Sequence, residues 1–97
     1  MAEIVWSERS ISDLEDIYDY IARDSHLYAQ YTVENIFKAV ERLRGFPDSE
    51  RHLPELPDMP YREVITGNYR VIYRYDEAKE NIIIITVLHG SRLLKER

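Results

Sequence analysis

The chain has 97 residues, of which 44% are hydrophobic and 32% charged, with a formal net charge of -5 and no cysteine. This length predicts a single domain spanning residues 1–97, because a second core would need more chain. The composition excludes a membrane protein, a disulfide framework and a thiolate metal site. Non-specific nucleic-acid binding requires a basic surface, so this acidic chain is expected to bind no DNA directly on its own.

The N-terminal segment lacks the positive and apolar stretches of a signal peptide, which favours a cytoplasmic location. Residues 3–6 predict a short strand, and Ser7 stands where the N-cap of a helix belongs. Apolar side chains then recur at helical spacing, and the acidic residues between them predict a solvated outer face. The apolar stripe consists of Ile11, Leu14, Ile17, Tyr18 and Ile21.

A second helix is predicted after Asp24-Ser25, which can cap it, and Gly45 is expected to end it. The short break between the two helices predicts an antiparallel hairpin. Residues 46–60 hold all four prolines and predict a loop. The apolar stripe of the second helix consists of Ala29, Val33, Ile36, Phe37, Val40 and Leu43.

Three strands are predicted in the second half, at residues 61–65, 69–75 and 82–89, with a tight turn at 66–68. The order strand, helix, helix, strand, strand, strand (β-α-α-β-β-β) predicts an α+β fold. In this fold a small, mainly antiparallel sheet carries the helical hairpin on one face and the first strand at one edge. We expect the opposite face to be partly open. In the last strand, alternation places four side chains on one face: Ile83, Ile85, Val87 and His89.

Two arginines alternate with aromatic and aliphatic side chains in the predicted strand 69–75. Arg70 and Arg74 share one face, and tyrosines with a valine fill the other. A strand face with two guanidinium groups predicts a surface that meets an anion, such as a phosphate, a carboxylate or an acidic partner. The alternative is that both arginines pair with carboxylates across the hairpins, at Glu63, Asp76 or Glu77.

A larger cationic cluster forms if neighbouring strands point their basic residues the same way. Arg62 lies in the first of the three strands and His89 ends the last. These two residues and Arg70 form a cluster if all three share a face, and Arg92 follows on the exit turn. Alternation alone leaves the register between the strands open.

Such a cluster suits the cleavage of RNA by attack of its own 2′-hydroxyl. That reaction needs a base, an acid for the leaving oxygen, and cations for the charge that develops on the phosphate. His89 can serve as acid or base near neutral pH, and Arg62 and Arg70 can hold the phosphate. The alternative is that His89 only ends a strand. No cofactor and no metal site is predicted, because His26 and His52 lie apart from other ligands.

Several short motifs follow one another along nearly the whole chain. They are Val5-Trp6-Ser7, Asp13-Leu14, Ile17 to Ala22, Phe46-Pro47, Arg51 with Pro54-Glu55-Leu56, Tyr61-Arg62-Glu63-Val64, Tyr69 to Tyr73, and Val87-Leu88-His89 with Arg92. In order and spacing they resemble the RelE/ParE superfamily, which comprises toxins of bacterial type II toxin–antitoxin systems. The fold that this resemblance implies agrees with the one predicted from periodicity.

The superfamily divides by target: RelE-like members are ribosome-dependent mRNA endoribonucleases, and ParE-like members are implied to inhibit DNA gyrase. By resemblance, Arg70 matches the phosphate-binding arginine of the nucleases, and Arg62 stands where they have a first catalytic lysine. Val64 stands in place of their second lysine, and Leu94 in place of their C-terminal tyrosine. These departures and the acidic charge favour a ParE-like toxin of the plasmid-stabilisation type that inhibits DNA gyrase.

Two alternatives stay open. The first is a RelE-like nuclease that acts on ribosome-bound mRNA, with Arg62, Arg70, His89 and Arg92 as its catalytic residues. The second is a non-toxic binding module derived from the same superfamily. Either would keep the fold and change only what the surface does.

The resemblance also implies a cognate antitoxin as a partner. The disordered tail of that antitoxin is expected to fold across the groove between the helix pair and the sheet. The candidate contacts for partner binding are Leu27, Tyr31, Arg74 and Leu93.

Overall fold

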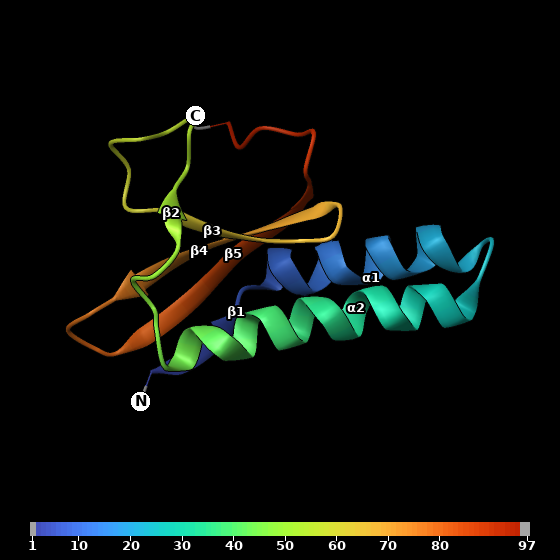
Figure 1. Cartoon of the computed structure of the whole chain (residues 1–97), viewed down its shortest axis with the longest axis horizontal. Coiled ribbons are helices and arrows are strands. Elements are labelled where there is room, and N and C mark those ends of the chain that lie inside the picture. The colour runs from blue at the N-terminus through green and yellow to red at the C-terminus, as the bar shows by residue number, and fades with distance from the viewer. Residues whose placement is uncertain (1, 96–97) are drawn as a thin grey trace.

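The elements of the protein, in chain order, are β1 (Glu3–Trp6), α1 (Glu8–Ala22), α2 (His26–Glu41), the 3-10 turn η1 (Arg42–Arg44), β2 (Arg51–His52), β3 (Arg62–Thr66), β4 (Tyr69–Asp76) and β5 (Asn81–His89). The structure is a computed structural model that describes residues 2–95. The five strands form one sheet in the order β1-β5-β4-β3-β2. β1 pairs with β5 in parallel at one edge, and the remaining pairs are antiparallel. The predicted α+β class and helical hairpin are confirmed (Figure 1), and the short strand β2 is an addition.

Both helices begin at serine caps, as predicted. The Ser7 hydroxyl accepts a hydrogen bond from the Ser10 amide at 3.0 Å, and the Ser25 hydroxyl accepts one from the Tyr28 amide at 3.0 Å. α2 ends at Glu41 and continues as the 3-10 turn η1. Gly45 follows that turn with a φ of -86°, not in the left-handed conformation typical of a glycine after a helix. Within residues 2–95, neither helix has the length and apolar character that crossing a membrane requires.

The main core lies between the sheet and the helix pair. The predicted apolar face of β4, with Val71 and Tyr73, is buried there, and Val64 of β3 lies beside it. Burial of each large apolar side chain stabilises the fold by about 1.5–3 kcal/mol. The helices contribute Leu14, Ile36, Ala39 and Val40, and β5 contributes Ile82, Ile84 and Val87.

The opposite face of the sheet is covered only in part, in agreement with the expected partly open face, and Ile65 of β3 remains 56% exposed there. The proline-rich loop and the C-terminal segment both cross it, on the side away from the helices (Figure 1). Leu53 from the loop and Leu94 from the C-terminal segment are buried against Ile72 of β4. Apolar side chains in segments without regular structure therefore build a second, smaller core, which strand periodicity alone does not reveal.

The predicted common face of the last strand is wrong, because β5 contains a bulge. Ile72 is opposite Thr86 while Tyr73 is opposite Ile84, so Ile85 is an extra residue in the ladder. The bulge turns Val87 to the helix side, whereas Ile85 packs in the second core. An extra residue in a strand shifts every later side chain to the other face.

Side chains from the start of α1 satisfy the polar groups of this bulge. The Ser7 hydroxyl donates to the Ile85 carbonyl at 2.9 Å. The Asp13 carboxylate accepts the Val87 amide at 2.9 Å and also the Thr86 hydroxyl. The helix that covers the sheet thus also fixes the irregular part of its central strand.

Candidate functional site

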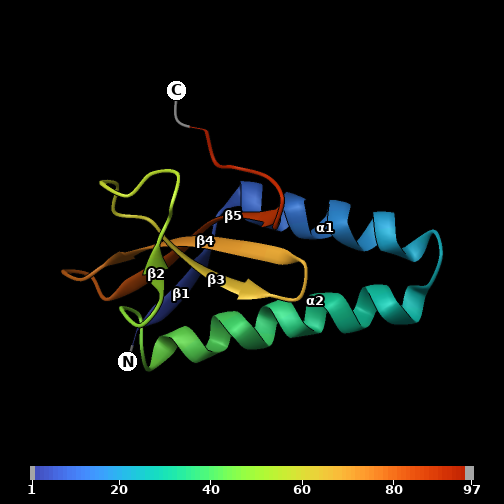
Figure 2. The ribbon, with the colours of Figure 1, turned by 45° about the horizontal axis from the view of Figure 1, so that its top comes forward.

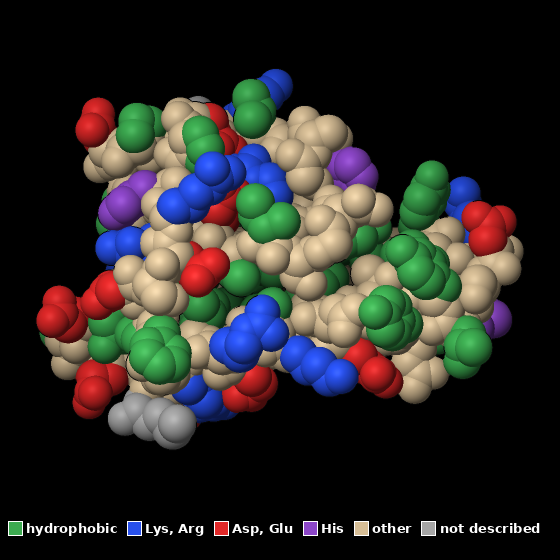
Figure 3. All heavy atoms as spheres, viewed as in Figure 1, with side chains coloured by type: hydrophobic (Ala, Val, Ile, Leu, Met, Phe, Trp, Pro, Cys, Tyr) green, Lys and Arg blue, Asp and Glu red, His purple; other side chains and the backbone are tan. Residues whose placement is uncertain are grey.

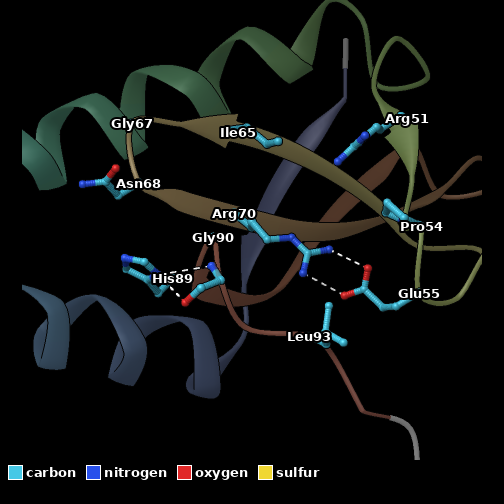
Figure 4. Close-up of a pocket in the computed structure, with 11 residues that line it drawn as sticks. Arg51, Pro54, Glu55, Ile65, Gly67, Asn68, Arg70, His89, Gly90 and Leu93 are labelled. Carbon is cyan, nitrogen blue, oxygen red and sulfur yellow. Dashed lines mark hydrogen bonds and ion pairs between the residues drawn. The ribbon is translucent and has the colours of Figure 1, made fainter.

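A cleft of about 640 Å³ lies on the side of the sheet away from the helices, and Arg70 forms its floor (Figure 4). The guanidinium of Arg70 donates from Nε to Glu63 Oε1 at 2.6 Å and from Nη2 to Glu55 Oε1 at 2.8 Å. Its Nη1 donates to the Arg92 carbonyl at 2.6 Å. Two carboxylates and one carbonyl therefore already accept the N–H donors of Arg70 that a bound anion would need.

These contacts belong to a longer ionic network in which the charges balance. Glu63 Oε2 accepts from Arg51 Nε at 2.6 Å, and Glu55 Oε2 accepts the Leu94 amide at 2.9 Å. The Glu63 side chain is fully buried, with 0% exposure, and that of Arg70 is 7% exposed. Two arginines face two glutamates, so the network neutralises itself and ties the loop and the C-terminal segment to the sheet.

The pKa values of this network follow from its hydrogen bonds. The Arg70 guanidinium lowers the pKa of Glu55 to about 2, and the Leu94 amide adds to this effect. Glu55 in turn, followed by Glu63, raises the pKa of Arg70. Glu55 and Arg70 thus favour each other's ionised form.

The predicted cluster of Arg62, Arg70 and His89 does not form. Arg62 is opposite Tyr73, on the helix side, whereas Arg70 points to the other side. Arg62 donates from Nη1 to the Glu50 carbonyl at 2.6 Å and lies 3.9 Å from Asp48. The reason is the register between β3 and β4, which pairs Arg62 with Tyr73. Residues that pair directly across two strands point to the same face, and Tyr73 faces the helices.

His89 also lies on the helix side, opposite Tyr69, with its ring edge-on to that tyrosine at 5.8 Å between centroids. Tyr69 and Tyr73 are four residues apart along β4, so His89 and Arg62 are separated by roughly 13 Å along the strands. The Arg92 carbonyl accepts a hydrogen bond from Arg70, and Arg92 lines a neighbouring cleft together with His89. His89, at the end of β5, also lines the Arg70 cleft, so the structure brings these two candidates to one cleft, whereas Arg62 lies on the other side of the sheet.

The candidate partner-binding residues lie on separate surfaces. Leu27, Tyr31 and Leu93 are 79%, 60% and 64% exposed. Tyr31 lines a groove beside the helices, and Leu93 stands at the rim of the Arg70 cleft. Arg74 is half-buried on β4, opposite Ile83. A partner that covers all of them must wrap around the protein.

An apolar groove between α1 and α2 is not among the features predicted from the sequence. It has a volume of about 470 Å³. Ile11 and Phe37, which were assigned to buried stripes, are 48% and 44% exposed, and Phe37 packs edge-on against Trp6 at 5.1 Å. The sheet covers only part of each apolar stripe, and the width of the stripes is the signal that could have revealed the groove. Its lining includes Trp6, Ile11, Leu14, Tyr18, Val33 and Phe37.

The comparison with known proteins identifies the family. The sequence model described as "ParE toxin of type II toxin-antitoxin system, parDE" matches residues 4–94. The chain belongs to the ParE toxin family. A curated relative, "Toxin RelE2" of Caulobacter vibrioides, is 33% identical over 93 residues, which are 96% of this chain and 100% of the relative. The protein is therefore a type II toxin–antitoxin toxin of the RelE/ParE superfamily.

Solved structures share the fold of this ParE-family chain. A chromosomal ParDE system from P. aeruginosa matches with a TM-score of 0.73 and 20% identity, over 92% of this chain and 96% of that chain. The intact E. coli RelBE toxin-antitoxin complex matches with a TM-score of 0.68 and 18% identity, over 95% of this chain and 100% of that chain. Both branches of the superfamily thus share this architecture.

Two positions singled out by the resemblance are core positions in this ParE-family toxin. Val64, in place of a nuclease lysine, is 6% exposed and packs under the helices. Leu94, in place of a nuclease tyrosine, is 9% exposed and packs in the second core. Both side chains are committed to packing and face no open cleft.

Proposed function

We propose that this protein is a ParE-like toxin that inhibits DNA gyrase by binding it, and that it does not cleave RNA. The observation that carries the proposal is the closed ionic network around Arg70. A phosphate can reach that guanidinium only by displacing Glu55 or Glu63, whose carboxylates would then repel it. The net charge of -5 also opposes docking on ribosomal RNA.

A cognate antitoxin is part of this proposal, because several of the matching structures are toxin-antitoxin complexes. The apolar groove between α1 and α2 fits the apolar face of an amphipathic helix from such a partner. An extended tail that continues from this helix would reach Leu27 and Tyr31. A second extended segment would be needed to cover Leu93 and Arg74.

A RelE-like nuclease is the second candidate. The curated relative carries the name Toxin RelE2, and His89 lines the same cleft as Arg70. In that case Arg62, Arg70, His89 and Arg92 would be the catalytic residues. The phosphate would then have to open the ionic network on binding.

Purified protein added to DNA gyrase is expected to inhibit supercoiling, while mRNA on translating ribosomes stays intact in a primer-extension assay. An Arg62→Ala variant provides the matched control, because Arg62 holds only the loop at Glu50 and should leave gyrase inhibition unchanged. Cleaved mRNA together with normal supercoiling would contradict the proposal. Loss of that cleavage in Arg62→Ala would establish the nuclease instead.

A further inference from the structure

Four tyrosine rings line a groove of about 470 Å³ between the helix pair and the β3–β4 turn. We define this tyrosine groove by Tyr20 of α1, Tyr28 and Tyr31 of α2, and Tyr69 of β4. His89 closes it on the side of β5. The tip of the helical hairpin extends beyond the end of the sheet in Figures 1 and 2, and green side chains gather over this part in Figure 3.

The fold does not use three of these rings for its core. Tyr20, Tyr28 and Tyr31 are 68%, 55% and 60% exposed. Tyr28 and Tyr31 stack at 6.2 Å between centroids and 26° between planes. Burial, followed by the neighbouring phenols of Tyr28 and Tyr20, raises the pKa of Tyr69. A gathering of exposed aromatic rings is typical of a binding surface.

The chemistry of the groove favours a cation. The faces of aromatic rings carry negative potential and attract guanidinium and ammonium groups. The Tyr20 ring already attracts one cation, because the guanidinium carbon of Arg23 lies 5.7 Å from its centroid. Many other side chains that line the groove are neutral, such as Thr32 and Asn35.

The surroundings add negative charge to this potential. A neighbouring cleft shares Tyr20, Tyr69 and His89 with the groove and is also lined by the acidic Asp13 and Asp16. Arg92 lines that cleft as well and offsets one of these charges. The chain as a whole has a net charge of -5. Tyrosines can also stack nucleobases, but this acidic field repels a phosphate backbone.

We propose that the tyrosine groove holds an arginine side chain presented by the protein target of the toxin. The proposal rests on the proposed function in one respect, namely that the target is a protein. The guanidinium would lie against the ring faces of Tyr28 and Tyr31, and Asp13 and Asp16 of the neighbouring cleft would add to the negative potential around it. The antitoxin would occupy the apolar groove between α1 and α2, and its tail, on reaching Tyr31, would compete with the target for the tyrosine groove.

The test uses the purified toxin and two matched peptides, acetyl-Gly-Arg-Gly-amide and the same peptide with citrulline, which is neutral and has nearly the same shape. Binding is followed by NMR of the tyrosine rings. The arginine peptide is expected to bind saturably and about fivefold more tightly than the citrulline peptide. Equal affinity for the two peptides, no saturable binding, or binding of AMP in preference to the arginine peptide would each overturn the proposal.

Two double variants identify the site. Tyr28→Leu with Tyr31→Leu should weaken arginine-peptide binding by about fivefold, whereas Tyr28→Phe with Tyr31→Phe should keep it, because phenylalanine retains the ring face. Both rings are exposed, and thermal unfolding checks that the fold is intact. Unchanged binding in the leucine variant would contradict the assignment.

The peptide measurement needs no gyrase, so its outcome is separate from that of the supercoiling assay. Arginine binding without gyrase inhibition would support the arginine site and indicate a protein target other than gyrase. Gyrase inhibition without arginine binding would support the proposed function and contradict the arginine site in the tyrosine groove.

Discussion

Replacing Arg70 with leucine is expected to lower the free energy of unfolding by roughly 3–5 kcal/mol, because two glutamates then lose their shared cation. Glu63 is the more sensitive of the two, since its side chain is fully buried and only the exposed Arg51 remains to pair with it. Urea unfolding of the wild type and the variant measures the change.

Arg74→Leu is the matched control, because Arg74 lies on the same strand and the same face as Arg70 and is partly exposed. Its substitution should change the free energy of unfolding by less than about 1 kcal/mol. If both variants were equally stable, the Arg70 network would contribute nothing to stability, and its carboxylates would not hold Arg70 away from a phosphate.

Acid is expected to destabilise the protein through Glu55, whose pKa is lowered from an ordinary value of 4.5 to about 2. The folded state therefore favours the ionised carboxylate more than the unfolded state does. The resulting stabilisation is complete above about pH 5 and disappears as the pH falls towards 2. It amounts to roughly 3 kcal/mol, and the pH dependence of urea unfolding measures it.

In Glu55→Gln this acid-dependent part should be absent, so the stability curve between pH 5 and 2 should be flatter than that of the wild type. Glu34→Gln, an exposed change on α2, should keep the wild-type acid dependence. A wild-type slope in Glu55→Gln would mean that other carboxylates dominate acid unfolding.

Local features of the sequence were sufficient to predict the fold class. Ser7 and Ser25 begin the helices by accepting backbone amides three residues ahead, which is a short-range signal. The Gly67-Asn68 turn is equally local, and Gly67 has the positive φ of 56° that such a turn requires. Strand alternation also correctly assigned the apolar face of β4 to the core.

The site depends on contacts between distant residues, and these were not predictable from periodicity. Asp13 reaches the β5 bulge across 73 residues to Thr86. Glu63 is one of the predicted alternative partners of the strand arginines, but Glu55 lies in the proline-rich loop, whose path no sequence pattern defines. The bulge and the register decide which basic residues share a face, and alternation along single strands left both open.

The most direct test of a purely structural role for Arg70 is a variant in which the charged network is replaced by apolar side chains: Glu55→Leu, Glu63→Leu and Arg70→Met together. Such replacements of buried ion pairs are often neutral or stabilising, so this variant should fold. Expressed without antitoxin, it is predicted to arrest growth as the wild type does. A variant that folds, as shown by cooperative unfolding, but no longer arrests growth would contradict that role.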